Sequence, residues 1–296
     1  MSTQINENTL IQMFLDIDDF CQSYEKWRST QRSLPQSLDQ WTSALHRSEA
    51  MTILVYYHHS GYKCFQYYYK RLVQGELKSY FPITYGYKYF LSLIPKCFDL
   101  IFLFAQWQCK TAQRTQIYYI DSKRLPVCHN KRIHSHQVFR GIAQRGKSSM
   151  GWFYGLKLHL VINNLGQINS FLFTSANFSD NNQFVLQYLL DELQGICFGD
   201  KGYLSKLFEQ FYLRGLKLVT KVRKNMKNQL VPLHEKYQLM KRGIIESVND
   251  ILMTVCDLEH TRHRSPANAM THMIAAIIGY NYLPNKPKVI LKHLLN

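Results

Sequence analysis

Beyond about Thr111 the sequence alternates strand-like and helix-like segments in an order that few folds can accommodate. Residues 116–121 are a β-branched and aromatic run, and residues 152–163 and 167–175 flank a tight-turn signal, which predicts a hairpin. Five strands interleaved with helices predict an α/β domain with a mixed sheet. The segments expected after the hairpin are a helix over 180–193 with Asp180 as its N-cap, a strand over 195–199, a helix over 204–213, a strand over 216–222 and a helix over 237–256.

The first hundred residues instead have helical periodicity, which is clearest over residues 8–27. Two further helices, over 48–59 and 61–74, are compatible with a helix-turn-helix DNA reader, and a helical bundle with solvated basic residues is the alternative. We therefore expect an all-helical region over residues 1–112. The α/β domain would occupy residues 113–296 and end in an apolar closing helix.

The most apolar stretch, residues 89–107, is interrupted by Pro95, Lys96 and Asp99. A membrane span needs about 20 consecutive apolar residues, so we expect a buried helix with a proline break and no membrane span. The N-terminus lacks the basic start and apolar core of a signal peptide. Seven scattered cysteines without a Cys-x-x-Cys pair favour a reducing cytoplasm.

Charge is the next constraint, because 36 Lys and Arg against 20 Asp and Glu give a formal net charge of +16 with neutral His. An excess of this size indicates a polyanionic partner, most simply nucleic acid. The excess is uneven. Between Asp121 and Asp180 lie 58 residues without a single acid but with eight Lys and Arg, and Glu246 also follows a segment crowded with cations.

Three of the isolated acids occupy related places in the expected fold. Asp121 closes the first expected strand, Asp200 closes the fourth, and Glu246 lies on the last long helix. If those two strands are neighbours, their carboxylates meet at one edge of the sheet and the helix adds the third. Carboxylate oxygen suits Mg²⁺, and such a triad can hold two ions about 3.5–4 Å apart for phosphodiester chemistry. Structural alternatives are a turn acid at Asp121, an Asp200–Lys201 pair and a Glu246–Arg242 pair.

Two other clusters contain residues that could bind metal or phosphate. Cys128, His129, His134 and His136 match no common zinc-finger spacing, so a basic loop over DNA is favoured over a zinc site. Residues 260–264 suit phosphate contact, because Arg forms bidentate bonds to phosphate and does not ligate metals. A solvated basic face is the alternative there.

At these residues the sequence resembles the DDE transposases of bacterial insertion sequences, and most closely the insertion-sequence family numbered nine-eight-two. Related transposases place the Glu in a signature of Tyr, two residues, Arg, three residues, Glu, six residues and Lys. Arg242 and Glu246 fit its centre, whereas Leu239 and Met253 occupy the Tyr and Lys positions. The matching stretches are Tyr119-Ile120-Asp121-Ser122, Leu125 to His129, Gly151 to His159, Phe198-Gly199-Asp200-Lys201-Gly202-Tyr203, Arg242 to Glu246 and His260 to Ser265.

The resemblance implies a ribonuclease-H-like catalytic core, a mixed five-stranded sheet with helices, in which Asp121, Asp200 and Glu246 bind two Mg²⁺ or Mn²⁺ ions. It implies an enzyme that binds terminal inverted repeats, cleaves the DNA ends and joins their 3′-OH groups to target DNA. A homodimer or larger assembly on DNA, in the bacterial cytoplasm at the nucleoid, is expected. The residues expected to contact DNA are Lys123, Arg124, Lys131, Arg132, Lys157, Lys201, Arg242, Arg262, His263 and Arg264.

Two rival functions remain open at this level. A nuclease of the same fold would cut DNA and never join it. A catalytically silent derivative would bind DNA without cutting it. Neither rival changes the expected fold or the three acids.

Overall fold

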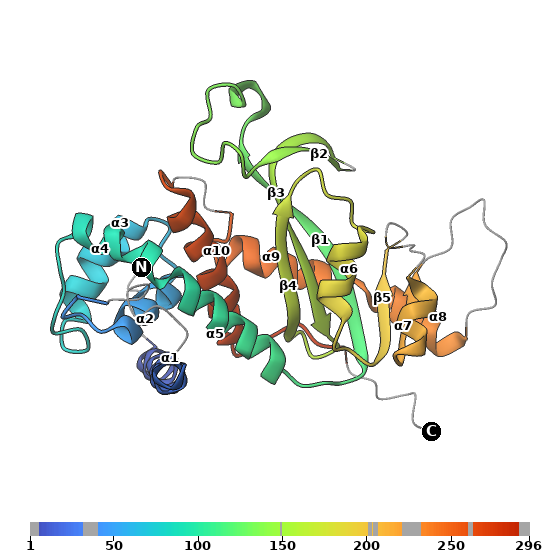
Figure 1. Cartoon of the computed structure of the whole chain (residues 1–296), viewed down its shortest axis with the longest axis horizontal. Helices are drawn as coiled ribbons and strands as arrows, with labels where there is room; N and C mark the ends of the chain where they lie inside the picture. Colours follow the sequence, from blue (N-terminus) through green and yellow to red (C-terminus); the bar gives the residue numbers. More distant parts are fainter. Residues whose placement is uncertain are drawn as a thin grey trace. The chain divides into compact units, whose positions relative to one another are not determined.

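The structure is a computed structural model that describes residues 6–31, 41–148, 150–200, 203, 207–220, 232–259 and 263–289 (Figure 1). The chain divides into two compact units. Unit 1 comprises Met1–Trp107 and Leu252–Leu283, and unit 2 comprises Gln108–Ile251 and Pro284–Asn296. The segment Leu252–Leu283 therefore packs with the N-terminal helices, whereas a single division between residues 112 and 113 was expected from the sequence.

Unit 1 is helical, as the sequence predicts. Asn6 caps the first helix by accepting a hydrogen bond from the Thr9 amide at 3.2 Å, and Pro95 lies in the short 3₁₀ turn that ends α4. Helix α2 is almost wholly buried and packs against α1 and α10. The helices that lie wholly or mostly in this unit are α1 (Glu7–Thr30), α2 (Arg47–Tyr57), α3 (Phe65–Tyr68), η2 (Tyr69–Glu76), α4 (Tyr87–Leu93), η3 (Ile94–Cys97), α5 (Phe98–Thr111) and α10 (Pro266–Asn281).

The expected helix-turn-helix pair corresponds to α2 and the α3–η2 segment. Most of the aromatic side chains there are core, since Tyr57, Tyr68 and Tyr69 are buried. Lys63, which precedes α3, donates to the Thr254 carbonyl oxygen at 2.7 Å and pairs with Asp257 at 3.7 Å. The role of this pair as a DNA reader stays a prediction.

One helical run among the described residues, Tyr87–Thr111, is long and apolar enough to cross a membrane. It consists of α4, η3 and α5, and Pro95 and Lys96 interrupt it. Phe90, Ile101 and Phe104 within it are buried. The expectation that the chain does not span a membrane stays a prediction.

Unit 2 is built on a mixed sheet of six strands among the described residues. Strand β3 pairs antiparallel with β1 along one edge. Along its other edge, β3 pairs antiparallel first with β2 and then with β4. Strand β5 pairs in parallel with β1, and β6 pairs in parallel with β5. The fold class is therefore the α/β, ribonuclease-H-like one expected, with one strand more than predicted. The strands are β1 (Ile117–Cys128), β2 (Gln144–Ser148), β3 (Gly151–Asn163), β4 (Ile168–Ser175), β5 (Gly195–Gly199) and β6 (Leu216–Thr220).

Three local expectations about unit 2 are wrong. Asp121 lies inside β1 and not at its end, because antiparallel pairing with β3 continues as far as Cys128. Asn182, not Asp180, caps α6 through the Val185 amide. The long final helix is two helices that meet at Arg242, followed by Gly243, a poor helix former. The helices of this unit are η4 (Asn130–Arg132), α6 (Gln183–Leu190), α7 (Phe208–Leu213), α8 (Leu233–Lys241) and α9 (Gly243–Thr254), the last of which continues into unit 1.

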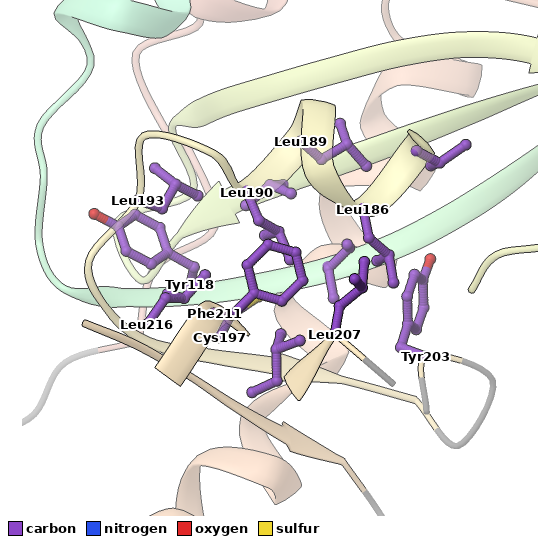
Figure 2. Close-up of a cluster of buried hydrophobic side chains, with 14 residues drawn as sticks. Tyr118, Leu186, Leu189, Leu190, Leu193, Cys197, Tyr203, Leu207, Phe211 and Leu216 are labelled. Atoms are coloured by element: carbon purple, nitrogen blue, oxygen red, sulfur yellow. The ribbon is translucent and has the colours of Figure 1, made fainter. Parts of the chain in front are cut away.

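The hydrophobic core of unit 2 lies between the sheet and helices α6 and α7 (Figure 2). Leu186, Leu189 and Leu190 of α6 and Phe211 of α7 belong to one buried cluster with Tyr118 of β1. Burial of each such side chain stabilises the fold by roughly 1.5–3 kcal/mol. This packing accompanies the parallel pairing of β5 with the start of β1, in which Phe198 lies opposite Tyr119.

Candidate functional site

Asp121 projects from the middle of β1 and is held by two residues of the following helical segments. Asn249 Nδ2 donates to Asp121 Oδ2 at 3.2 Å, and Arg242 Nη1 lies 3.6 Å from Asp121 Oδ1. The side chains of Asp121 and Arg242 are only 23% and 13% exposed. The carboxylate is therefore largely removed from water and its orientation is fixed by a neutral donor and a cation.

The pKa of Asp121 is raised to about 6, chiefly because burial penalises the charged form. The Arg242 guanidinium and the Ser122 backbone amide favour the charged form and limit the rise. The negative charges of Glu246 and Asp180 add to it. The negative charges of two further acids thus act on Asp121, which favours a cation at this part of the sheet.

Glu246 meets Asp121 through the same guanidinium. Arg242 Nη2 donates to Glu246 Oε1 at 2.9 Å, so one side chain contacts both acids. Arg242 ends α8 and Glu246 lies in the first turn of α9, where the helix dipole favours a carboxylate. The Arg242–Glu246 ion pair expected as an alternative is therefore present. Arg242 also contacts Asp121, so its side chain connects α9 with β1.

Asp200 directly follows β5, which pairs in parallel with β1 in the register Tyr119 to Phe198. The pairing of the two strands ends at Phe198, and Asp200 is not among the groups that shift the pKa of Asp121. The Asp200 carbonyl oxygen accepts a hydrogen bond from the Tyr203 amide at 3.0 Å. The part of the chain that the structure describes holds no group of three His, Cys, Asp or Glu side chains that could bind one metal ion. The three-carboxylate site therefore stays a prediction. Of its three acids, Asp121 and Glu246 are connected through Arg242.

Asp180 belongs to a polar cluster that the sequence did not predict. Ser122 Oγ donates to Asp180 Oδ1 at 2.8 Å, and Lys157 Nζ donates to the same oxygen at 3.1 Å and to the Phe178 carbonyl oxygen at 2.8 Å. Lys157, expected to contact DNA, is buried and directed into this cluster. The one signal in the sequence was Ser122, a hydrogen-bonding residue directly after Asp121, whose hydroxyl binds Asp180.

His159 lies behind this cluster on β3. It is fully buried, and its Nε2 is 2.9 Å from Thr174 Oγ1 on β4. Burial lowers the pKa of His159 to about 4, against a smaller opposing effect from Asp180. The neutral imidazole therefore serves as packing and as a hydrogen-bond partner near neutral pH.

The other residues expected to contact DNA are dispersed. Lys123 pairs with Asp250 at 3.3 Å, while Lys131 and Arg132 are exposed on η4. In unit 1, the ring of His263 packs on that of His272, with centroids 4.8 Å apart. Arg124 is half-buried on β1, Arg264 is exposed, and Lys201 and Arg262 lie outside the described residues.

The residues weighed as a possible zinc site, Cys128, His129, His134 and His136, lie in and around η4. His129 Nδ1 accepts a hydrogen bond from the Lys131 amide at 3.3 Å, which caps η4. His136 stacks on Phe139 with ring centroids 6.0 Å apart. Cys128 is a free thiol, like the other six cysteines. These contacts fit a folded basic loop, which was the favoured interpretation.

Comparison with known proteins gives one finding. The sequence model of a family described as "Transposase DDE domain" matches residues 111–266, which is more than half of the chain. Comparisons with curated proteins and with solved structures give no match. The matched segment contains Asp121, Asp200 and Glu246.

Proposed function

The chain belongs to the DDE transposase domain family, and from that premise we propose that it is the transposase of an insertion sequence. It would bind the terminal inverted repeats, cleave the DNA ends and join their 3′-OH groups to target DNA. The insertion-sequence family numbered nine-eight-two is the proposed group within these transposases. The observation that carries the proposal is the contact of one guanidinium, that of Arg242, with Asp121 and Glu246 from separate elements of the matched domain.

The acids fit a pair of Mg²⁺ or Mn²⁺ ions by their chemistry. Asp121 and Glu246 already share one cationic group, and the burial that raises the pKa of Asp121 makes a nearby positive charge favourable. Asp121, Asp200 and Glu246 are the proposed ligands. When bound, the ions would activate the attacking oxygen and stabilise the leaving oxygen of a phosphodiester.

The surrounding residues would position the acids and the DNA. Asn249 holds Asp121 Oδ2 in one orientation through its amide. Ser122 and Lys157 hold Asp180 at a fixed place beside the site. The exposed cations on η4 would neutralise DNA phosphates without reading sequence. A dimer or larger assembly acting on DNA in the cytoplasm is part of the proposal, because two ends must be brought together.

The decisive experiment is strand transfer by the full chain. A pre-cleaved oligonucleotide of the DNA that flanks the gene is incubated with supercoiled plasmid and Mg²⁺, and joined products are separated on gels. We expect joining by the unaltered chain and at least a thousandfold loss with Asp121→Asn. Gel-shift affinity for the same oligonucleotide should change less than threefold, because the amide keeps the shape of the side chain and removes only its charge.

Asp191→Asn is the matched control, because Asp191 forms an exposed ion pair with Arg214 in the same unit. It should join DNA like the unaltered chain. Cutting without joining by the unaltered chain would favour the nuclease, and DNA binding without either reaction would favour the silent derivative. Full activity of Asp121→Asn would remove Asp121 from the site.

A further inference from the structure

The hairpin of β2 and β3 (Figure 1) carries an exposed aromatic residue, Trp152, near the start of β3. Trp152 is 61% exposed, whereas its neighbour Phe153 is buried. Side chains alternate between the two faces of a strand, so Trp152 and Tyr154 share the outer face. The residues opposite them on β2 are Lys147 and Arg145, which gives this face two aromatic rings and two cations.

An open pocket of about 280 Å³ lies on this hairpin, lined by Asn130, Arg145 and Trp152. Lys147 Nζ lies 5.8 Å from the centre of the Trp152 ring. Asn130 Nδ2 donates to the Trp152 carbonyl oxygen at 2.7 Å, which ties η4 to the start of β3. The pocket is therefore lined by the Trp152 ring, the planar Arg145 guanidinium and the Asn130 amide. The hydrogen bond from Asn130 to Trp152 holds two of these residues together.

The hairpin is held rigidly against the rest of unit 2. A Cβ at Gly146 would overlap the carbonyl oxygen of Ala176, so the two backbones are in direct contact. Ser148 Oγ donates to the Gly151 carbonyl oxygen at 3.2 Å near the turn. A rigid aromatic side chain loses little conformational freedom when a ligand stacks on it, which favours binding.

Charge points to the class of ligand. The pocket lies in the 58-residue segment that has eight Lys and Arg and no acid. Exposure alone is not diagnostic, since Phe184 on α6 is 62% exposed, with its ring against Tyr188. Trp152 differs because cations surround it. An aromatic face beside Arg and Lys matches a flat base attached to a phosphate backbone.

We propose that this pocket binds an unpaired nucleobase of DNA. The base would stack on the Trp152 indole, Arg145 would donate hydrogen bonds to the base edge, and Lys147 would neutralise the adjoining phosphate. The nucleobase pocket depends on the proposed transposase function in one respect only, which is that DNA is the substrate. It adds a site that holds an exposed base at an end or junction of the DNA, apart from the three acids.

Binding in EDTA tests the pocket without any cleavage. The probes are a blunt 30-base-pair duplex and the same duplex with a short 3′ overhang that contains 2-aminopurine. The unaltered chain should quench the 2-aminopurine fluorescence and bind the overhang probe more tightly. Trp152→Ala should weaken overhang binding roughly 5- to 150-fold, the equivalent of about 1–3 kcal/mol for one stacked base. Its affinity for the blunt duplex should change less than twofold.

Trp152→Phe keeps an aromatic ring and should retain most of the quenching, and Phe184→Ala, the equally exposed control, should bind like the unaltered chain. Equal losses on both probes, or no loss on either, would overturn the proposal. Asp121→Asn should quench normally, because stacking does not need the acids. If the unaltered chain quenches 2-aminopurine but does not join DNA, only the transposase proposal is rejected. If it joins DNA normally but Trp152→Ala has no effect on overhang binding, only the base-binding pocket is rejected.

Discussion

At the scale of single residues, Arg242 is the side chain on which the candidate site depends. It is largely buried between two acids that come from elements more than 100 residues apart in sequence. A buried carboxylate that loses its cationic partner is strongly destabilising. The guanidinium therefore stabilises the acids in the absence of divalent ions.

Arg242→Ala should consequently destabilise the chain in EDTA by about 1–3 kcal/mol, and added Mg²⁺ should restore part of the loss by replacing the missing charge. Thermal unfolding with and without Mg²⁺ measures both effects. Arg214→Ala is the matched control, because its ion pair with Asp191 is exposed and should contribute no more than about 1 kcal/mol. Equal destabilisation by the two variants, with no response to Mg²⁺, would contradict this role of Arg242.

At the scale of secondary-structure elements, the close approach of β1 and β3 determines where Asp121 lies. Gly155 on β3 is paired with Pro126 on β1, and a Cβ at Gly155 would overlap the Leu125 carbonyl oxygen. A side chain there would push the strands apart at Pro126, five residues along β1 from Asp121. Glycine is required at this position by backbone contact and not by a turn.

Gly155→Ala should therefore lower the free energy of unfolding by about 1–3 kcal/mol and reduce strand transfer more than DNA binding. Urea unfolding followed by circular dichroism measures the first effect. Gly243→Ala is the comparison, because no neighbouring atom lies within 4 Å of a Cβ placed there. Alanine at Gly243 should leave stability unchanged or raise it slightly. The explanation is wrong if the two variants unfold at the same urea concentration.

At the scale of the whole molecule, the net charge of +16 should dominate DNA affinity. If six or more phosphates are neutralised, affinity for a blunt duplex should fall about a thousandfold or more between 50 mM and 200 mM salt. Fluorescence anisotropy titrations over that range give the slope of log affinity against log salt. Lys131→Ala combined with Arg132→Ala should reduce the slope by about 2.

The control for that experiment is the double variant Lys88→Ala, Lys96→Ala. It removes two exposed cations of the helical region that are not among the expected DNA contacts. Its slope should stay close to that of the unaltered chain. An equal reduction by both double variants would mean that net charge acts without a defined DNA-binding surface.

From the sequence alone, most of the elements, their order and the α/β class could be predicted, because apolar periodicity and turn residues act over a few positions. The sequence also singled out Asp121, Asp200 and Glu246 as candidate site residues, since acids are conspicuous in segments so rich in cations; their role as metal ligands stays a prediction. It placed Asp121 at a strand end, however, and it missed β2, because the pairing of β2 depends on the distant residues of β3.

Which side chains meet depends instead on the tertiary structure. Arg242 bridges Asp121 and Glu246, Asp180 is bound by Ser122 and Lys157, and the hairpin turns Trp152 outward beside Lys147 and Arg145. Helix α10 packs with the N-terminal helices although it follows all the strands of unit 2 in the chain. These contacts join residues that are distant in sequence or depend on strand register. Local patterns do not encode such pairs, which form only when burial of the shared core brings the elements together.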